Sequence, residues 1–389
     1  MAAKSWNVVD ASSSSSVEES TIVSAKDIQG APESMAVTKR VYSGGLSGGV
    51  EIIRVNNGRL VFDILVNRGL SLWNAWIGDF KYGWQSPVKG PVNPEHVHVG
   101  ESSGLGWLDG FDELMVRCGL ESNGAPEFDD DGRVLYPLHG RIANKPASKV
   151  DVSVDEDAGT ITVSGEVLET RFHFAKLKLT ASVTTSFGSN SLRIDDTVKN
   201  LSASASATQM LYHVNFGVPL LDAGSQVIAP CKTIVPRNDH AASGIDNWNS
   251  YGAPEAGFEE QVYFTDLHGD KDGETTVLLK NAHGTRGASL HYNVNQLPCF
   301  SMWKNTTAVE DGYVTGIEPG TNYPNPRTYE GEHGRETPLD PLGSTTFSLG
   351  IGFLENEAEV TQQESAVAKL LEGKDTHVYR KPRKGWCAP

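Results

Sequence analysis

The chain has 389 residues, of which 38% are hydrophobic and 21% are charged, and its formal net charge is −16. A chain this acidic repels phosphate backbones and anionic lipid, so nucleic acid and membrane surfaces are disfavoured as partners. Its 40 glycines and 19 prolines require many turns, which favours many short strands over long helices.

The first part of the chain combines a polar start, one clear strand and a long irregular segment. Residues 1–35 include the serine run 12–16 and show little apolar periodicity, so we interpret them as a polar N-terminal lead-in. A β pattern begins near residue 50, and the apolar run 60–66 predicts a strand. The segment 85–147 is rich in Pro, Gly, His and acidic residues, with one helix-like piece at 111–116. Long ordered loops usually serve a function, so we expect this segment to cover a site.

Strand patterns dominate the rest of the chain. Apolar residues alternate from Phe172 to Leu179, and two irregularities interrupt the strands: a Pro-, Asn- and Gly-rich segment at 231–270 and a helix predicted over 360–372. The predicted strands are 160–167, 171–183, 192–198, 209–216, 275–279, 289–294, 312–317 and 345–353.

This spacing of strands, with few short helices, predicts an all-β fold built as a large antiparallel sandwich. We divide the chain into the lead-in 1–35, a single sandwich domain over 36–358, and a C-terminal helix and basic tail over 359–389.

The cysteine pattern and the N-terminus bear on the compartment. None of the four cysteines forms a CxxC pair, which favours buried free thiols in a reducing environment. The N-terminus lacks a basic region followed by an apolar stretch, and no apolar run is long enough to span a bilayer. We therefore expect a cytoplasmic protein.

Two residues on predicted strands could exchange protons with a ligand. His213 lies among apolar neighbours, and an imidazole titrates near neutrality, although a hydrogen-bonded core histidine is the commoner case. Asn215 lies on the same strand face and is a candidate substrate contact. Glu318 ends an apolar strand before Pro-Gly, where partial burial would raise its pKa, although a solvated turn glutamate is equally compatible.

Further polar and aromatic residues fit a sugar site. His139 precedes Gly140, whose small size would let the backbone approach a ligand, and Arg141 follows. Arg68, after the first strand, has a guanidinium fork that suits paired hydroxyls or a carboxylate, although a structural ion pair would explain either arginine. Trp303 could stack on a sugar ring with Lys304 beside it, whereas most other tryptophans are expected to serve packing.

Metal binding has weaker support. His96 and His98 would share one strand face with Glu101 nearby, but a third ligand is unassigned and a surface role is favoured. The sequence contains no GxSxG, P-loop, HExxH or GxGxxG in a β-α setting, so we expect no cofactor, with a divalent metal as the alternative.

Several motifs together resemble the aldose-1-epimerase superfamily, and in particular an uncharacterised bacterial branch of unknown function. The likeness spans roughly residues 40–355. The residues that carry it are His213 in Tyr-His-Val-Asn-Phe-Gly, Glu318 in Gly-Ile-Glu-Pro-Gly, and the runs 104–111, 117–120, 137–144, 297–298 and 303–304.

The resemblance implies a galactose mutarotase-like β-supersandwich of large, twisted antiparallel sheets with a site in a concave cleft. It implies that His213 acts as acid and Glu318 as base, with His139 and Arg68 as sugar ligands. The family's hydroxyl-binding aspartate has only Asp239 or Asp246 as candidate counterparts.

The reaction implied is the interconversion of sugar anomers by acid–base ring opening of a mono- or small oligosaccharide, an acidic sugar included. Two alternatives stay open: an isomerase or lyase that uses the same pair, with His96 and His98 holding a metal, and a carbohydrate-binding protein or scaffold without catalysis.

Overall fold

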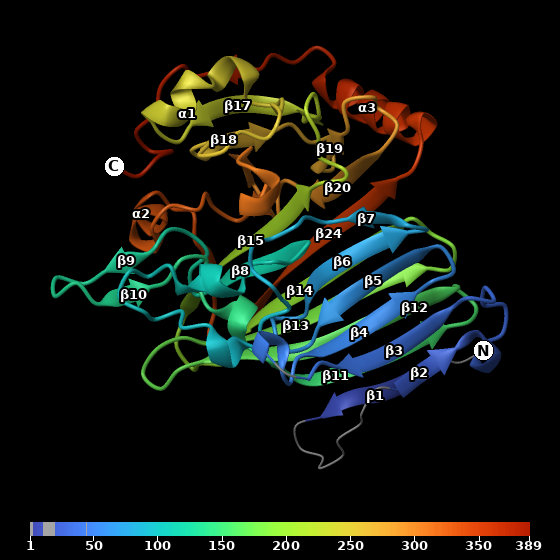
Figure 1. Ribbon diagram of the computed structural model, residues 1–389. Helices are drawn as coiled ribbons and strands as arrows, with labels where there is room; N and C mark the ends of the chain where they lie inside the picture. Colours follow the sequence, from blue (N-terminus) through green and yellow to red (C-terminus); the bar gives the residue numbers. More distant parts are fainter. Residues whose placement is uncertain (1–2, 11–19, 44) are drawn as a thin grey trace.

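The computed structural model describes residues 3–10, 20–43 and 45–389, and most of its regular elements are β-strands arranged in two large sheets (Figure 1). Within the described residues the first sheet has nine strands, all paired antiparallel. In spatial order they are β1 (Lys4–Asp10), β11 (Ala147–Asp155), β12 (Thr160–Thr170), β13 (Lys176–Ser186), β14 (Ser191–Asn200), β24 (Ser344–Leu354), β20 (Gly287–Asn293), β19 (Glu274–Lys280) and β16 (Gln226–Ile228).

The second sheet has fourteen strands in the described part of the chain, antiparallel except where β25 joins β17. Its main order is β2 (Ser20–Ser24), β3 (Ala36–Val41), β4 (Glu51–Asn56), β5 (Leu60–Leu65), β6 (Ser71–Ile77), β8 (Met115–Leu120), β15 (Ser206–Gly217), β22 (Val314–Gly320), β21 (Cys299–Asn305), β18 (Gln261–Leu267), β17 (Cys231–Pro236) and β25 (His377–Val378). The short strand β7 (Phe80–Tyr82) pairs with β6, β23 (Thr337–Leu339) pairs with β15, and β9 (Glu127–Phe128) and β10 (Val134–Tyr136) form a separate hairpin.

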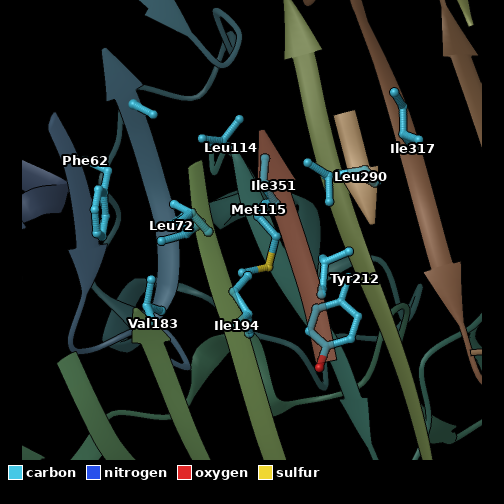
Figure 2. Packing of buried hydrophobic residues seen from close by; sticks show 14 of the residues in the cluster. Phe62, Leu72, Leu114, Met115, Val183, Ile194, Tyr212, Leu290, Ile317 and Ile351 are labelled. Atoms are coloured by element: carbon cyan, nitrogen blue, oxygen red, sulfur yellow. The ribbon is translucent and has the colours of Figure 1, made fainter. Parts of the chain in front are cut away.

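The two sheets share one hydrophobic core, because alternate residues of each strand point inward. Figure 2 shows Val183 and Ile194 of the first sheet facing Leu72, Met115 and Tyr212 of the second. This packing confirms the predicted all-β sandwich.

Strand β15 is buried along most of its length and has a different role on each face. Its even-numbered side chains, including Tyr212 and Val214, enter the core between the sheets. Its odd-numbered side chains, including Leu211 and His213, point to the opposite face of the large sheet, where loops cover them. One strand therefore carries both core and site residues.

Every predicted strand overlaps an observed one, and the helix predicted over 360–372 is confirmed as α3 (Glu357–Leu371). The helix-like piece predicted at 111–116 is not helical, because β8 begins at Met115. The segment 231–270, predicted to be irregular, contains β17, α1 (Asp239–Ser243) and β18. A further helix, the short α2 (Arg327–Glu332), follows β22. The alternation starting at Phe172 is also not that of a strand, because Phe172 is 81% exposed in the turn before β13.

The segment expected to be a polar lead-in contributes strands instead. Strands β1 and β2 lie at the edges of the two sheets, near the N-terminus in Figure 1. The serine run 12–16 lies outside the described residues. At the other end, the tail after α3 is packed as well, since Trp386 stacks on Tyr323 with ring centroids 5.0 Å apart. Strand pairing of β1 and β2 and ring stacking of Trp386 therefore attach the described N-terminal segments and the C-terminal tail to the sandwich.

Each of the four cysteines, all within the described residues, is buried and unpaired, as expected. None of the described helices combines the length and the apolar character that crossing a membrane requires.

Candidate active site

The two residues singled out for proton transfer lie side by side on neighbouring strands. Strands β15 and β22 pair Val214 with Ile317 and Leu211 with Gly320, so His213 and Glu318 come to directly opposite positions. His213 Nε2 lies 3.2 Å from Glu318 Oε1, and both side chains are almost fully buried. The antiparallel register therefore brings together two groups that are about a hundred residues apart in the sequence.

A cavity of about 500 Å³ lies in front of this pair. One wall is aromatic and is formed by Trp84, Trp107 and Phe111 from the long segment before β8, together with Trp303 of β21. The polar lining includes His139, His213, Arg237, Glu260 and Glu318. The segment 85–147 thus covers a cavity, as its length led us to expect.

Aromatic rings surround His213 closely. Its ring centroid lies 5.2 Å from that of Phe111, 5.3 Å from that of His139 and 5.6 Å from that of Trp303. Burial among these rings lowers the pKa of His213 well below its ordinary value, and the neighbouring His139 acts in the same direction. The imidazole is therefore neutral near pH 7, with Nδ1 2.6 Å from Asn215 Oδ1.

The pKa of Glu318 is shifted in the opposite direction from that of His213. Burial raises the pKa of its carboxyl group well above the ordinary value, and the negative charge of Glu260 adds to the effect. Among the described residues, Glu318 Oε1 has no hydrogen-bond partner although it is buried. A buried oxygen without a partner is costly unless a ligand or water satisfies it, so this atom is available to a hydroxyl in the cavity.

His139 presents a second neutral imidazole to the cavity. Its backbone has φ = 56°, in the left-handed region, and its Nδ1 donates a hydrogen bond of 2.9 Å to the Asn123 carbonyl. Burial lowers the pKa of His139 to about 4. Because Nδ1 carries the proton, Nε2 is left as an acceptor. A Cβ on the adjacent Gly140 would clash with the backbone carbonyls of Gly119 and Ser122. Packing within the chain therefore explains this glycine without a ligand.

Arg68 and Asn215 lie behind the cavity, so the interpretation of both as sugar ligands was wrong. Arg68 is completely buried, pairs with Glu113 at 2.7 Å and donates to the Gly110 carbonyl. Asn215 is also fully buried and contacts His213 from behind. The Glu113 carbonyl accepts a hydrogen bond from Asn215, so Arg68 supports the residue that holds the histidine.

Lys304 and Arg141 do not line the cavity either. Lys304 follows Trp303 on β21 and therefore points to the opposite face of the sheet, where its ammonium group donates to the Asn247 carbonyl. Arg141 instead acts on Glu169: burial raises the pKa of the Glu169 carboxyl, and the positive charge of Arg141 opposes part of this shift. Of the predicted substrate contacts, His139 and Trp303 reach the cavity.

The metal hypothesis finds no support in the geometry. His96 ends a short 3₁₀ turn, and both it and His98 are exposed rather than paired on a strand face. Across the described ranges, no three His, Cys, Asp or Glu side chains are grouped to hold a metal. Asp239 and Asp246 are not cavity residues, since Asp239 opens α1 and Asp246 pairs with Arg380.

Four of the cavity residues that sequence reasoning missed are informative. Trp107 and Phe111 belong to a motif already noted, yet their direction depends on a loop that the sequence does not predict. Arg237 and Glu260 fall in the segment thought irregular, and their charged groups lie 3.8 Å apart. Glu260 also accepts a 2.6 Å hydrogen bond from the Trp303 indole, which fixes that ring.

A larger groove, of about 850 Å³, lies on the outer face of the nine-stranded sheet beside α3. Both of its arginines are already paired, Arg193 with Asp195 and Arg59 with Glu355. It therefore lacks the unsatisfied buried groups that distinguish the cavity at His213.

The fold is that of the galactose mutarotase-like class, built here from two large sheets. The chain belongs to the family described as "Domain of unknown function (DUF4432)", whose sequence profile matches residues 47–353. It is similar to a candidate aldose 1-epimerase from Klebsiella pneumoniae subsp. pneumoniae MGH 78578, with 34% identity and a TM-score of 0.93 over 98% of this chain and 99% of that one.

More distant structures share the fold alone. A galactose mutarotase-like protein from Clostridium acetobutylicum is 14% identical, with a TM-score of 0.55 over 82% of this chain and 99% of that one. Galactose 1-epimerase from Lactobacillus acidophilus NCFM is 13% identical, with a TM-score of 0.55 over 83% of this chain and 100% of that one. No curated protein matches the chain by sequence.

Proposed function

We propose that this protein interconverts the anomers of a sugar by acid–base ring opening, with His213 and Glu318 as the proton-transfer pair. The observation that carries the proposal is the contact of 3.2 Å between His213 Nε2 and Glu318 Oε1 at the cavity, where Glu318 Oε1 has no other partner in the described chain. Similarity to a candidate aldose 1-epimerase over nearly the whole chain supports it.

The reaction needs one acid and one base at the same time. One member of the pair removes the proton of the anomeric hydroxyl while the other gives a proton to the ring oxygen, and the C1–O5 bond breaks. Rotation about C1–C2 and closure on the other carbonyl face give the other anomer, and the protons return. Each such transfer contributes a factor of about 10² to 10⁴ in rate. The opposite pKa shifts of His213 and Glu318 separate the two roles.

We propose a neutral sugar as the substrate. Arg237 is the one cation among the cavity residues of the described chain, and Glu260 lies 3.8 Å from it. A carboxylate or phosphate on the sugar would therefore meet no unmatched positive charge. The tryptophan and phenylalanine rings instead offer apolar surfaces to the face of a pyranose. A cavity of about 500 Å³ has room for a monosaccharide or a short oligosaccharide.

Exchange NMR on a panel of neutral aldoses tests the proposal, because it detects the interconversion of anomers directly. Glu318→Gln should lower the exchange rate at least ~100-fold while sugar binding persists, since the amide cannot donate or accept the proton that moves. The matched control is Glu169→Gln, a buried carboxyl with a raised pKa outside the cavity, which should retain the rate. Full activity of Glu318→Gln would refute the proposed role, and wild-type protein that binds a sugar without exchanging its anomers would be a binding protein.

A further inference from the structure

Two neighbouring carbonyl groups hold His139 in place at the cavity. Its main-chain N–H donates to the Gly124 carbonyl at 2.8 Å, and its ring Nδ1 donates to the Asn123 carbonyl at 2.9 Å. A carbonyl oxygen only accepts, so turning the ring over would break the second bond, whether the ring is neutral or charged. The two bonds therefore fix where His139 places Nε2, which has no hydrogen-bond partner within the described residues.

A pair of side-chain amides positions the segment that carries these carbonyls. Nδ2 of Asn123 donates to Oδ1 of Asn322 at 2.9 Å, and Nδ2 of Asn322 donates to Oδ1 of Asn123 at 2.8 Å. Both residues are completely buried. Separating the two amides would leave buried donors and acceptors without partners, which is costly. The pair is therefore a firm link between the loop after β8 and the chain that follows β22.

Main-chain contacts press the same two segments together. The Ala125 N–H donates to the Pro324 carbonyl at 3.1 Å, and a Cβ on Gly124 would lie 1.9 Å from the Asn325 carbonyl oxygen. The two main chains therefore lie in direct contact at Gly124. Ala125 and Pro324 also line the cavity, so this contact forms part of its wall.

The C-terminal tail holds the segment 322–325 in turn. The ring of Tyr323 stacks on both Phe264 and Trp386, with centroid distances of 4.8 and 5.0 Å. Asn325 donates to the Trp386 carbonyl at 2.8 Å and accepts from the Ala388 N–H at 3.0 Å. The segment that contains Asn322 is thus fixed by the large sheet and by the tail.

We propose that Asn322 is a positioning residue, whose amide pair with Asn123 fixes the His139 ring relative to the carboxyl group of Glu318. Asn322 lies four residues after Glu318, so one short segment carries the carboxyl group and also sets the place of the imidazole. A sugar that contacts both groups binds best when their separation is set in advance, because no binding energy is then spent on ordering them. The inference rests on the proposed function for the nature of the ligand, whereas the order of the ring concerns the protein without sugar.

Proton exchange at the His139 ring tests the inference without sugar. In histidine-labelled protein followed by nitrogen-15 NMR, the Nδ1–H signal, assigned by its loss in His139→Asn, should exchange slowly with water because the Asn123 carbonyl holds it. Asn322→Ala removes the amide pair, so this exchange should become at least ~10-fold faster. An unchanged exchange rate would overturn the inference and would show that packing against Trp107 is enough to order the ring.

Sugar affinity tests the consequence for the site. Tryptophan fluorescence reports binding because Trp107 and Trp303 line the cavity, and the probe is the neutral aldose that binds best in the panel used for exchange NMR. In Asn322→Ala, Kd and KM should rise about fivefold, as expected for one weakened hydrogen bond, while kcat changes less than about twofold. A lower kcat with an unchanged KM would contradict the positioning role. If the wild-type protein exchanges no anomers, the proposed function fails, whereas the Nδ1–H measurement still decides the inference.

A double-mutant cycle separates the amide pair from general damage to the fold. In Asn123→Ala the amide of Asn322 has already lost its partner, so adding Asn322→Ala should change the Nδ1–H exchange rate by less than about twofold. Effects of the two substitutions that multiply would contradict the pair as the link. If Asn322→Ala does not fold, Asn322→Ser takes its place, since one hydroxyl cannot form the two-bond pair.

The matched control is Asn200→Ala. Asn200 is also completely buried and donates to the carbonyls of Ser204 and Asp340, and it does not line the cavity. The variant therefore reproduces the general cost of removing a buried amide. It should leave the Nδ1–H exchange rate of His139 and the sugar affinity at their wild-type values, and a change equal to that of Asn322→Ala would overturn the specific role of Asn322.

Discussion

Gly316 leaves the space in which the proton-transfer pair meets. It lies on β22 two residues before Glu318, and its conformation is extended, so glycine is not required there for its backbone angles. A Cβ at this position would lie inside the contact radius of Glu318 Oε1 and 2.9 Å from His213 Cε1. We therefore expect Gly316→Ala to separate the pair while the strand stays intact.

The size of the effect follows from those contacts. Ordinary contacts to a Cβ begin at 3.4 Å, so the Glu318 carboxyl must move about 1 Å and the imidazole about half as far. Misplacement of about 1 Å in a catalytic group lowers the rate by roughly 10²-fold. Crowding one methyl into a packed site costs about 1–3 kcal/mol, partly offset by ~0.4–1 kcal/mol from the reduced freedom of the unfolded chain. The variant should therefore fold with a free energy of unfolding lower by at most about 2–3 kcal/mol, and it should exchange anomers about a hundredfold more slowly.

The assay is exchange NMR of sugar anomers, with urea unfolding of the same samples. Gly350→Ala is the matched control, because Gly350 also lies within a strand and its added Cβ would make only an ordinary contact of 3.5 Å with His291 Cβ. It should keep wild-type activity. A Gly316→Ala protein that folds normally and exchanges anomers at the wild-type rate would contradict the assignment of His213 and Glu318.

Two further predictions concern stability. Arg68→Leu leaves the buried Glu113 carboxylate without its ion pair, which should reduce the free energy of unfolding by about 3–5 kcal/mol in urea titration; a change under 1 kcal/mol would contradict the structural role of Arg68. The folded pKa of His139 is about 4, below its ordinary value of 6.5, so the unfolded chain binds more protons between these pH values. Neutral His139 therefore adds to the free energy of unfolding in full above pH 6.5, and this contribution is lost as the pH falls to about 4. The loss is at most ~3 kcal/mol, because the cavity partly solvates the ring. His139→Asn, which tolerates the left-handed backbone, should flatten this dependence, and an unaltered acid slope would show that His139 does not cause it.

Strand positions and the fold class were predictable because they depend on local pattern. The predicted strands 160–167 and 192–198 correspond to β12 and β14, and the predicted strand 209–216 corresponds to β15, which the structure extends to Ser206–Gly217. Strand β8 was missed because its buried residues do not alternate and it follows an irregular loop. Where a strand has both faces buried, periodicity carries little information.

The candidate site was predictable in part for the same reason. Residue type and strand context singled out His213 and Glu318, but four of the six predicted substrate contacts do not line the cavity. Arg68 has the right chemistry for a sugar hydroxyl, yet its guanidinium is matched by Glu113 and the Gly110 carbonyl inside the fold. Lys304 differs from Trp303 by one residue, and on a strand one residue reverses the face.

The sequence by itself determined the strand-rich fold, the absence of paired cysteine motifs and the residue types able to move a proton, because each depends on local composition and short-range periodicity. Only the tertiary structure decided the register between β15 and β22 that places His213 opposite Glu318. It also decided which polar groups face the cavity and which are satisfied behind it, as Asn215 is by the Glu113 carbonyl. Pairing between distant strands and the desolvation of single atoms are properties of the packed chain, and no local pattern encodes them.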